Sequence, residues 1–352
     1  MRSRGGNCRA AAVRCAIEIA IAACLGMGCF AAACAQTAPQ ITAPEWKLST
    51  ALGPAYPQGR AGAIWAQLIR ERSGGRLNVK VFPGAALVQR DPAREFAALR
   101  DGAIDLAVGS TTSWAMQVKE LNLLALPWLV PDRDALDVLL RGEVATRLSA
   151  AIEAAGAMPL AWAGDGFREL ATRRAVRVPE DLKGLSVRVA PTPLLLDTLQ
   201  ALAAAPVSMD AAAALAAQRR GALDGEEISV AAYAASRAYT AGFSRLLLWG
   251  AHADALIFAI NRSIWQHLGE SDRDLVLQAA RDAAQEAATM GRKLSDSAAL
   301  AELSRQGVSV TRLTPAGKQQ FREATRGVYE RWTPVVGADL VQAAEAAVSA
   351  PR

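Results

Sequence analysis

A chain of 352 residues is long enough to form two domains with a large hydrophobic core. Hydrophobic residues make up 52% of it and alanine is very frequent, which is typical of a helix-rich α/β protein. The formal net charge is +5, but four of the arginines lie within the first 14 residues. No basic cluster with interleaved aromatic side chains follows, so nucleic acid is not an expected partner.

Residues 1–35 have the pattern of a secretory signal peptide. A basic start precedes an apolar run from Cys15 to Ala35, which contains only Glu18 as a charge and closes with an Ala-x-Ala motif. Cleavage after Ala35 would remove all five cysteines, and the loss of four arginines and one glutamate would lower the net charge from +5 to +2. The mature chain would then have no disulfide and no thiol chemistry, which suits the oxidising periplasm where we expect it.

Two other interpretations of this segment remain open. The apolar run of 21 residues is long enough to span a bilayer as a retained anchor. Residues 21–24, Ile-Ala-Ala-Cys, resemble a lipoprotein signal, which would make Cys24 the first residue of the mature chain.

The first part of the mature chain alternates between predicted strands and helices. Apolar spacing, glycine breaks and an Asp91-Pro92 helix start define these elements. They are a strand at 46–51, a break at 53–59, a helix at 61–72 that Ser73-Gly74-Gly75 ends, a strand at 77–82, a helix from 91 to 100 and a strand at 104–109. This β-α-β-α-β series predicts a mostly parallel sheet covered by helices.

The second part continues the α/β pattern. The predicted elements are a strand at 160–163, a turn at 164–166, a strand at 185–189, a helix near 194–203, a strand at 257–260, a helix at 271–304 capped by Ser271, a strand at 308–313 and a final helix opened by Thr314-Pro315. The helix at 271–304 is equally well described as two shorter helices broken near Gly291. No flexible linker interrupts residues 36–345, so two lobes would be connected by chain crossings with a cleft between them.

Arg188 lies in an unusual place. The alternation of residues 185–189 puts it opposite the apolar face of a short strand, which Pro191 and Pro193 then stop. Such an arginine either faces water or pairs with a negatively charged group.

Five stretches, taken with their order and spacing, resemble one known family. They are SGGRLNVKVFPG (73–84), REFAALRDGAIDLAVGS (94–110), LPWL (126–129), PEDLKGLSVRV (179–189) and RRGALDGEE (219–227). From about Trp46 to about Tyr329 the chain resembles the DctP-type extracytoplasmic solute receptors of tripartite ATP-independent periplasmic (TRAP) transporters.

The resemblance implies a two-lobed periplasmic binding protein fold of type II-like α/β architecture. Each lobe would be a mixed, mostly parallel sheet flanked by helices, and a long helix would span both lobes. Lobe I would comprise residues 36–165 and 254–293, and lobe II residues 166–253 and 294–352. A small organic anion, a carboxylate, would bind between them.

The resemblance also implies the site residues. Arg188 would form a salt bridge with the ligand carboxylate, for which the planar, always charged guanidinium is suited. Arg168, in Gly166-Phe167-Arg168, would be a second arginine of the site. The remaining candidate ligand-binding residues are Ser110, Thr111, Ser113, Trp114, Thr192, Met209 and Ile228.

Three positions depart from the family pattern. Ile228 replaces a common asparagine, Ala213 a common glutamate and Ala211 an often aromatic residue. These changes predict a ligand whose body is less polar, or bulkier, than a hydroxylated dicarboxylate or a sugar acid.

No catalytic or metal motif accompanies these features. His252 and His267 are not at metal-ligand spacing, and Glu226-Glu227 are expected at a turn as solvated or capping residues. No Gly-x-Ser-x-Gly, phosphate-binding loop or dinucleotide fingerprint occurs. We therefore expect no cofactor, no metal and no catalytic residue.

The preferred function is a monomeric periplasmic receptor that delivers a carboxylate to TRAP membrane subunits. A ligand sensor for a signalling partner is one alternative, and a periplasmic enzyme is another that the missing motifs argue against.

Overall fold

The computed structural model describes residues 45–350, so the predicted signal peptide lies outside the described residues. Within that range no helix is both long enough and apolar enough to cross a bilayer.

The described strands form one mixed sheet. They are β1 (Glu45–Thr50), β2 (Asn78–Pro83), β3 (Leu106–Ser110), β4 (Ala157–Thr172), β5 (Ser186–Val189), β6 (Ala205–Ser208), β7 (Gly225–Ser229), β8 (Arg245–Asn261) and β9 (Ser309–Arg312). The order is β2-β1-β3-β8-β4-β7-β5-β6, and β9 pairs with β8. Both ends of the sheet are parallel, as predicted, but the central pairs β3-β8, β8-β4 and β4-β7 are antiparallel.

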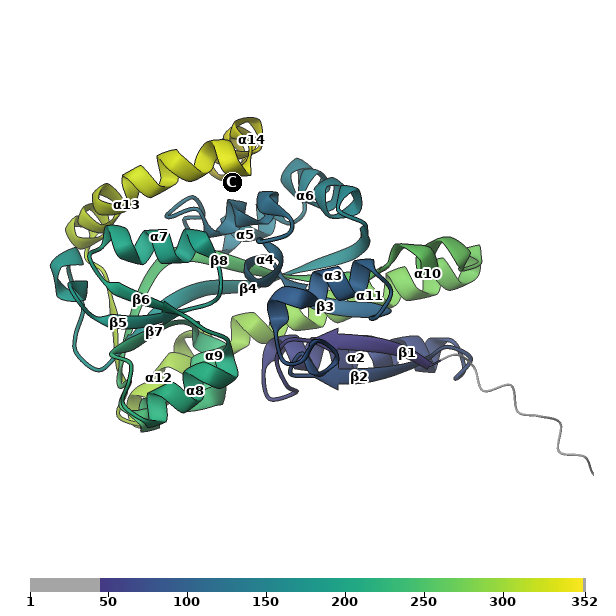
Figure 1. Ribbon diagram of the computed structural model, residues 1–352, viewed down its shortest axis with the longest axis horizontal. Helices are drawn as coiled ribbons and strands as arrows, with labels where there is room; N and C mark the ends of the chain where they lie inside the picture. Colours follow the sequence, from purple (N-terminus) through teal and green to yellow (C-terminus); the bar gives the residue numbers. More distant parts are fainter. Residues whose placement is uncertain (1–44, 351–352) are drawn as a thin grey trace, which may run out of the picture. The chain divides into compact units, whose positions relative to one another are not determined.

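Two long strands connect the two ends of the sheet. β4 has 16 residues and β8 has 17. The last part of β8 pairs with β3, whereas its first part pairs with β9, and the last part of β4 pairs with β7 (Figure 1). Each long strand therefore belongs to both ends, as expected of chain crossings between lobes. The lobe boundaries themselves stay a prediction.

The predicted turn at 164–166 is wrong, because β4 runs straight through it. Gly164 pairs with Ala255 and Gly166 with Asp254, so Asp165 is an extra residue in a β-bulge. Gly166 has a φ of +98°, and a Cβ there would lie 2.6 Å from Nη2 of Arg133. The two glycines allow the bulge, which sequence reasoning interpreted as a chain reversal.

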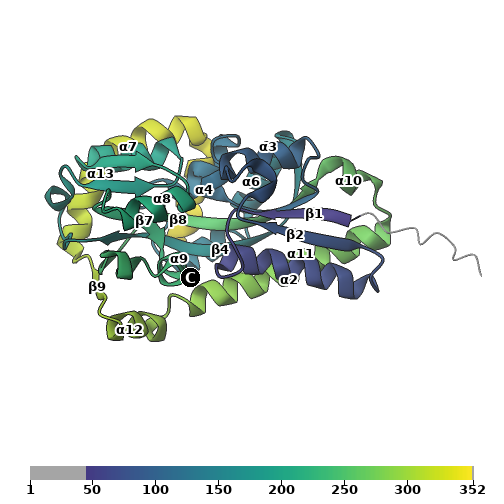
Figure 2. The ribbon, with the colours of Figure 1, turned by 60° about the horizontal axis from the view of Figure 1, so that its bottom comes forward.

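Helices cover both faces of the sheet. The α-helices are α2 (Pro57–Arg72), α3 (Glu95–Arg100), α4 (Thr111–Trp114), α5 (Arg133–Leu139), α6 (Glu143–Ala154), α7 (Pro193–Ala201), α8 (Ala211–Arg219), α9 (Val230–Ser236), α10 (Arg262–His267), α11 (Glu270–Lys293), α12 (Ser297–Arg305), α13 (Pro315–Val336) and α14 (Ala338–Ser349). Short 3₁₀ turns are η1 (Ala86–Val88), η2 (Pro92–Arg94), η3 (Lys119–Ala125), η4 (Pro179–Leu182) and η5 (Ala238–Ala241). In Figure 2, α2 and α11 run side by side, and α11 also packs against β4.

Several helices differ from the sequence prediction. The segment predicted as one helix at 271–304 is two helices, α11 and α12, but the break follows Lys293 rather than Gly291, and Gly269 rather than Ser271 precedes the first helix. Helix α2 starts at Pro57, where a break was expected, since a proline without an N–H is tolerated at a helix start. The helix opened by Thr314-Pro315 is followed by one more, α14.

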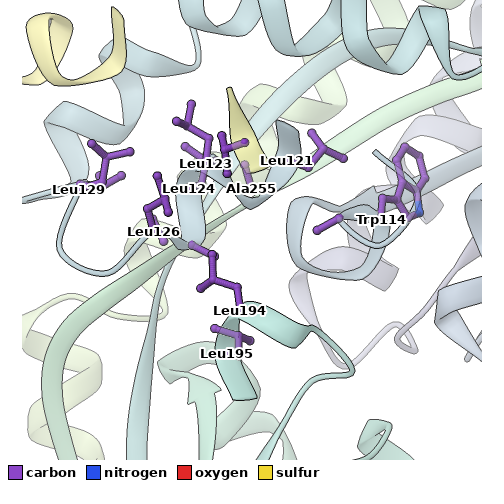
Figure 3. Packing of buried hydrophobic residues seen from close by; sticks show 14 of the residues in the cluster. Trp114, Leu121, Leu123, Leu124, Leu126, Leu129, Leu194, Leu195 and Ala255 are labelled. Atoms are coloured by element: carbon purple, nitrogen blue, oxygen red, sulfur yellow. The ribbon is translucent and has the colours of Figure 1, made fainter. Parts of the chain in front are cut away.

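Three clusters of buried apolar side chains form the core. The largest lies where η3 and the LPWL segment pack against α7 and β8, and Figure 3 shows its leucines around Leu126 and Leu194. A second joins α2 and α11 to the β1-β3-β8 end of the sheet, and a third joins α9 and α12 to β7 and β8. The long crossing strands contribute to all three clusters.

Candidate functional site

A cavity of about 160 Å³ lies where the carboxyl ends of strands from both ends of the sheet meet. Segments after β1 and β3 line it from one side, and segments after β5, β6 and β7 from the other. The crossing strands β4 and β8 contribute Asp165, Arg168, Asp254 and Leu256. Ligands of open α/β sheets bind beyond the carboxyl ends of strands, so this cavity is the candidate binding site.

Arg188 enters the cavity from β5 with its guanidinium only partly engaged. Its side chain is 7% exposed, Nη1 donates to Oε1 of Glu226 at 2.9 Å, and Nε donates to the Met209 carbonyl at 2.9 Å. Nη2 has no hydrogen-bond partner among the described residues, although the residue lines the cavity. Burial lowers the pKa of Arg188 and raises that of Glu226, since their mutual attraction does not fully offset the loss of water. One edge of a buried cation is therefore open to an additional anion.

Arg168 lines the same cavity but is committed to protein acids. Its Nε donates to Oε2 of Glu227 at 2.7 Å, its Nη2 donates to the Glu227 carbonyl at 3.1 Å, and its Nη1 lies 3.6 Å from Oδ2 of Asp254. Burial alone would lower the pKa of Arg168, but the charges of Glu227 and Asp254 raise it. Burial would likewise raise the pKa of Glu227, whereas Arg168 and His252 hold it at about 2.

The expectation that Glu226 and Glu227 are solvated at a turn is wrong. Both lie in β7, between β4 and β5, and are 3% and 0% exposed. A strand covered on both faces buries consecutive side chains, so each carboxylate takes an arginine as its partner.

Ser110 and Ser113 line the cavity from the end of β3. Ser110 caps α4: its Oγ accepts from the Ser113 N–H at 3.1 Å, and the Ser110 N–H donates back to Oγ of Ser113 at 3.2 Å. Two neighbours do not reach the cavity. Thr111 donates from Oγ1 to Oδ1 of Asp254 at 2.7 Å, and the fully buried Trp114 packs edge-on against Phe96 at 5.2 Å between ring centroids.

Ile228 lines the cavity, but Thr192 and Met209 do not. Thr192 is buried, and its Oγ1 donates to the Thr112 carbonyl at 3.0 Å, joining the segment after β5 to the segment after β3. Met209 supplies only its carbonyl, which holds Arg188. Of the nine candidate residues, the structure thus brings five to the cavity.

Part of the cavity wall on the β5-β6-β7 side is apolar. It includes Ala211, Leu215, Ile228 and Ala232. Ala211 and Ile228 are two of the positions whose departure from the family pattern predicted a less polar ligand body. The third, Ala213, is outside the lining.

Sequence reasoning missed several polar residues of the lining. Thr112 and Gln218 are each 3% exposed, and Oγ1 of Thr112 and Oε1 of Gln218 have no hydrogen-bond partner among the described residues. Asp165 and Asp254 also line the cavity. The Gly-Asp-Gly sequence around Asp165 was the available signal, because glycines on both sides of a polar residue allow a bulge.

The cavity lining is rich in acids. It contains four carboxyl side chains, Asp165, Asp210, Glu226 and Asp254, and two guanidinium groups, Arg168 and Arg188. Burial and the charge of Asp254 raise the pKa of Asp165 to about 6, although Arg168 and Arg133 oppose the shift. The electrostatic environment of the cavity therefore disfavours a ligand with several negative charges.

The two histidines lie outside the cavity lining. His252 is buried with Nδ1 3.2 Å from Oε1 of Glu227, and the exposed His267 has Nδ1 2.7 Å from the Ser263 carbonyl. No group of three His, Cys, Asp or Glu side chains suited to a metal occurs in residues 45–350.

Comparisons with known proteins agree with this architecture. The family model of bacterial extracellular solute-binding proteins, family 7, matches residues 48–334. A solute-binding protein of Chromohalobacter salexigens is 29% identical over 246 residues, which cover 69% of this chain and 72% of that protein. An uncharacterized protein of Sinorhizobium fredii is 31% identical over 281 residues, 79% of this chain, but the match spans only 50% of that longer relative.

Solved structures show the same fold. A TRAP periplasmic solute-binding protein of Ralstonia eutropha H16 with bound (S)-2-acetolactate has a TM-score of 0.85 and 46% identity, covering 87% of this chain and 98% of that one. A Shewanella oneidensis TRAP periplasmic solute-binding protein with bound succinate has a TM-score of 0.81 at 22% identity. With its family match, its two-ended sheet and its cavity between the strand ends, this chain belongs to the bacterial extracellular solute-binding proteins of family 7, the DctP-type family of solute receptors rather than of enzymes.

Proposed function

We propose that the protein is a periplasmic receptor for a small, branched 2-hydroxy or 2-oxo monocarboxylate, which it delivers to TRAP membrane subunits. The observation that carries the proposal is Arg188, a buried guanidinium at the cavity whose Nη2 has no hydrogen-bond partner within residues 45–350. A ligand carboxylate bound there would share the cation with Glu226.

The cavity wall favours a compact, weakly polar ligand body. Ala211, Ile228 and Ala232 offer methyl groups where a sugar acid would need hydrogen-bond partners. The relative with 46% identity holds (S)-2-acetolactate, a branched monocarboxylate of four main-chain carbons with one hydroxyl and one keto group. Four relatives named as C4-dicarboxylate-binding proteins share less of this sequence, with 23–27% identity.

Capture would follow the opening and closing of the two ends of the sheet. Ligand would enter while the lobes are apart, Arg188 would pair with its carboxylate, and bending at the crossing strands β4 and β8 would close the cavity. Ser110 and Ser113 would approach the ligand from the opposite side. The closed form would then dock on the membrane subunits, without any covalent step.

The test is isothermal titration of the mature chain, starting at residue 36, with 2-hydroxy-2-methylbutanoate, a stable branched hydroxy acid. Loss of one partner of a buried charged pair costs about 2–5 kcal/mol, so Arg188→Ala should weaken binding by at least about 30-fold. Arg141→Ala, which removes an arginine that is 75% exposed, is the matched control and should bind like the wild type. Equal binding by the Arg188 variant and the wild type would refute the proposal.

A further inference from the structure

Two polar side chains of the cavity lining, Asp165 and Thr112, have no hydrogen-bond partner among the described residues. Asp165 is half-buried and its carboxylate accepts no hydrogen bond there, and Oγ1 of the nearly fully buried Thr112 is likewise unpartnered. Both residues line the cavity. Polar groups in such positions cost free energy unless a guest or water satisfies them.

The backbone connects both residues to Asp254. The N–H of Thr112 donates to Oδ1 of Asp254 at 3.2 Å, and Asp254 pairs across the strands with Gly166, the residue after Asp165. The bulge between the two glycines leaves Asp165 without a register partner on β8, and bulges of this kind re-aim side chains. Helix α11 supports the bulge from behind, since a Cβ at Gly291 would lie 3.5 Å from the Gly164 carbonyl.

The chemistry of the pair matches an alcohol. A carboxylate only accepts hydrogen bonds, whereas a threonine hydroxyl can donate one, and an alcohol needs both an acceptor for its proton and a donor for its oxygen. Asp254 is less available than Asp165, because its Oδ1 already accepts from Oγ1 of Thr111 and from the N–H of Thr112, and its Oδ2 lies 3.6 Å from Nη1 of Arg168.

The negative charge of Asp165 has a second consequence, which concerns dicarboxylate ligands. Arg168 is already paired with two carboxylates, those of Glu227 and Asp254, whereas the ion pair of Arg188 is with Glu226 alone and its Nη2 has no hydrogen-bond partner among the described residues. A second carboxylate on the ligand would approach Asp165 with no free cation to neutralise it. Like charges facing each other in a desolvated site discriminate strongly against the wrong ligand.

We infer that Asp165 and Thr112 form a hydroxyl-recognition subsite that selects 2-hydroxy monocarboxylates and rejects dicarboxylates. This inference rests on the proposed function, because it takes the ligand carboxylate to be held by Arg188. Asp165 and Thr112 were not among the ligand-binding residues predicted from the sequence.

Three probes separate the two effects. 2-Hydroxy-2-methylbutanoate carries the alcohol, 2,2-dimethylbutanoate replaces that hydroxyl with a methyl group, and citramalate keeps the alcohol but adds a second carboxylate. Titrations at pH 7.5 should give the wild type at least about tenfold preference for the first acid over each of the other two.

The variants should change the preference for the hydroxyl group and the preference against the second carboxylate separately. Thr112→Val should reduce the hydroxyl preference several-fold and leave the preference against citramalate intact. Asp165→Asn, which keeps an acceptor oxygen but removes the charge, should mainly relax the rejection of citramalate, whereas Asp165→Ala should lose both preferences. The control is Asp296→Asn, whose exposed carboxylate caps α12 through the N–H of Ala299 outside the cavity lining, and it should keep both preferences.

The outcomes distinguish this inference from the proposed function. If Arg188→Ala abolishes binding but the Asp165 and Thr112 variants keep both wild-type preferences, the subsite is refuted while the receptor stands. If the wild type binds none of the three acids, or if Arg188 is dispensable, both are refuted. Circular dichroism melts identify any variant that fails to fold. If one Asp165 variant does not fold, the other Asp165 variant decides, through its binding of citramalate and of 2,2-dimethylbutanoate relative to 2-hydroxy-2-methylbutanoate.

Discussion

Glu226 should act as a competitor of the ligand for Arg188. Its Oε1 lies 2.9 Å from Nη1, and the pair is almost completely buried. A ligand carboxylate on Nη2 would lie about 5 Å from the Glu226 carboxylate, and at an effective dielectric constant of about 20 the repulsion amounts to about 3 kcal/mol. Since Arg188 and Arg168 offset part of this repulsion, we expect Glu226→Gln to tighten carboxylate binding by about 1–2 kcal/mol, roughly tenfold.

The same substitution should weaken the unliganded protein. Removal of one partner of a buried ion pair costs about 3–5 kcal/mol, and the glutamine oxygen that remains as an acceptor should limit the loss to about 1–3 kcal/mol. The ligand should therefore stabilise the variant more than the wild type. Titration calorimetry and thermal melts with and without 2-hydroxy-2-methylbutanoate measure both quantities.

Glu302→Gln is the matched control, since its carboxylate is 51% exposed and pairs with Arg305 at the surface. Unchanged or weaker ligand binding by the Glu226 variant, with its melting temperature lowered, would refute the idea that the two carboxylates share one guanidinium.

Two further predictions concern closure and pH. Thr192→Val removes the hydrogen bond to the Thr112 carbonyl, so it should destabilise the closed form by about 1 kcal/mol and weaken ligand binding about fivefold. Thr198→Val, which removes a hydrogen bond within α7, is the control and should have neither effect. Identical affinity of the two variants in titrations, together with identical ligand-induced compaction in small-angle scattering, would contradict this prediction. Burial raises the pKa of Glu95 from 4.5 to about 7, against its hydrogen bonds from Ser49 and Trp114. Its folded-state pKa lies above its unfolded value, so the folded protein holds the extra proton and stability should fall by roughly 3 kcal/mol as pH rises from about 4.5 to about 7. Glu95→Gln should flatten this part of the profile in urea unfolding followed from pH 4.5 to 7.5, and an unchanged slope would contradict the assignment.

Local signals predicted most of the elements but not their continuity. Apolar runs predict strands at 160–163 and 257–260, yet each run is only a short part of a strand of 16 or 17 residues. Gly164, Asp165 and Gly166 are turn-forming residues in most contexts, and only pairing with β8, about 90 residues later, makes them a bulge. Long-range pairing of this kind leaves no trace in local composition.

The candidate site could be predicted only in part, again because long-range pairing decides which side chains reach the cavity. Arg188 stood out because alternation placed a charge in a short strand beside proline breaks, and the structure places it at the cavity. The burial of Glu226 and Glu227 depends on β7 lying between two other strands, which no local pattern reveals. Thr192 and Trp114 follow the strand ends as expected, but hydrogen bonding and packing turn them away from the cavity.

A crystal structure of the mature protein with 2-hydroxy-2-methylbutanoate would show directly where the ligand carboxylate binds. We expect one carboxylate oxygen about 2.7–2.9 Å from Nη2 of Arg188, with Glu226 still on Nη1. A ligand bound with its carboxylate away from this guanidinium, or a fully occupied Nη2 that contacts only protein, would contradict this expectation.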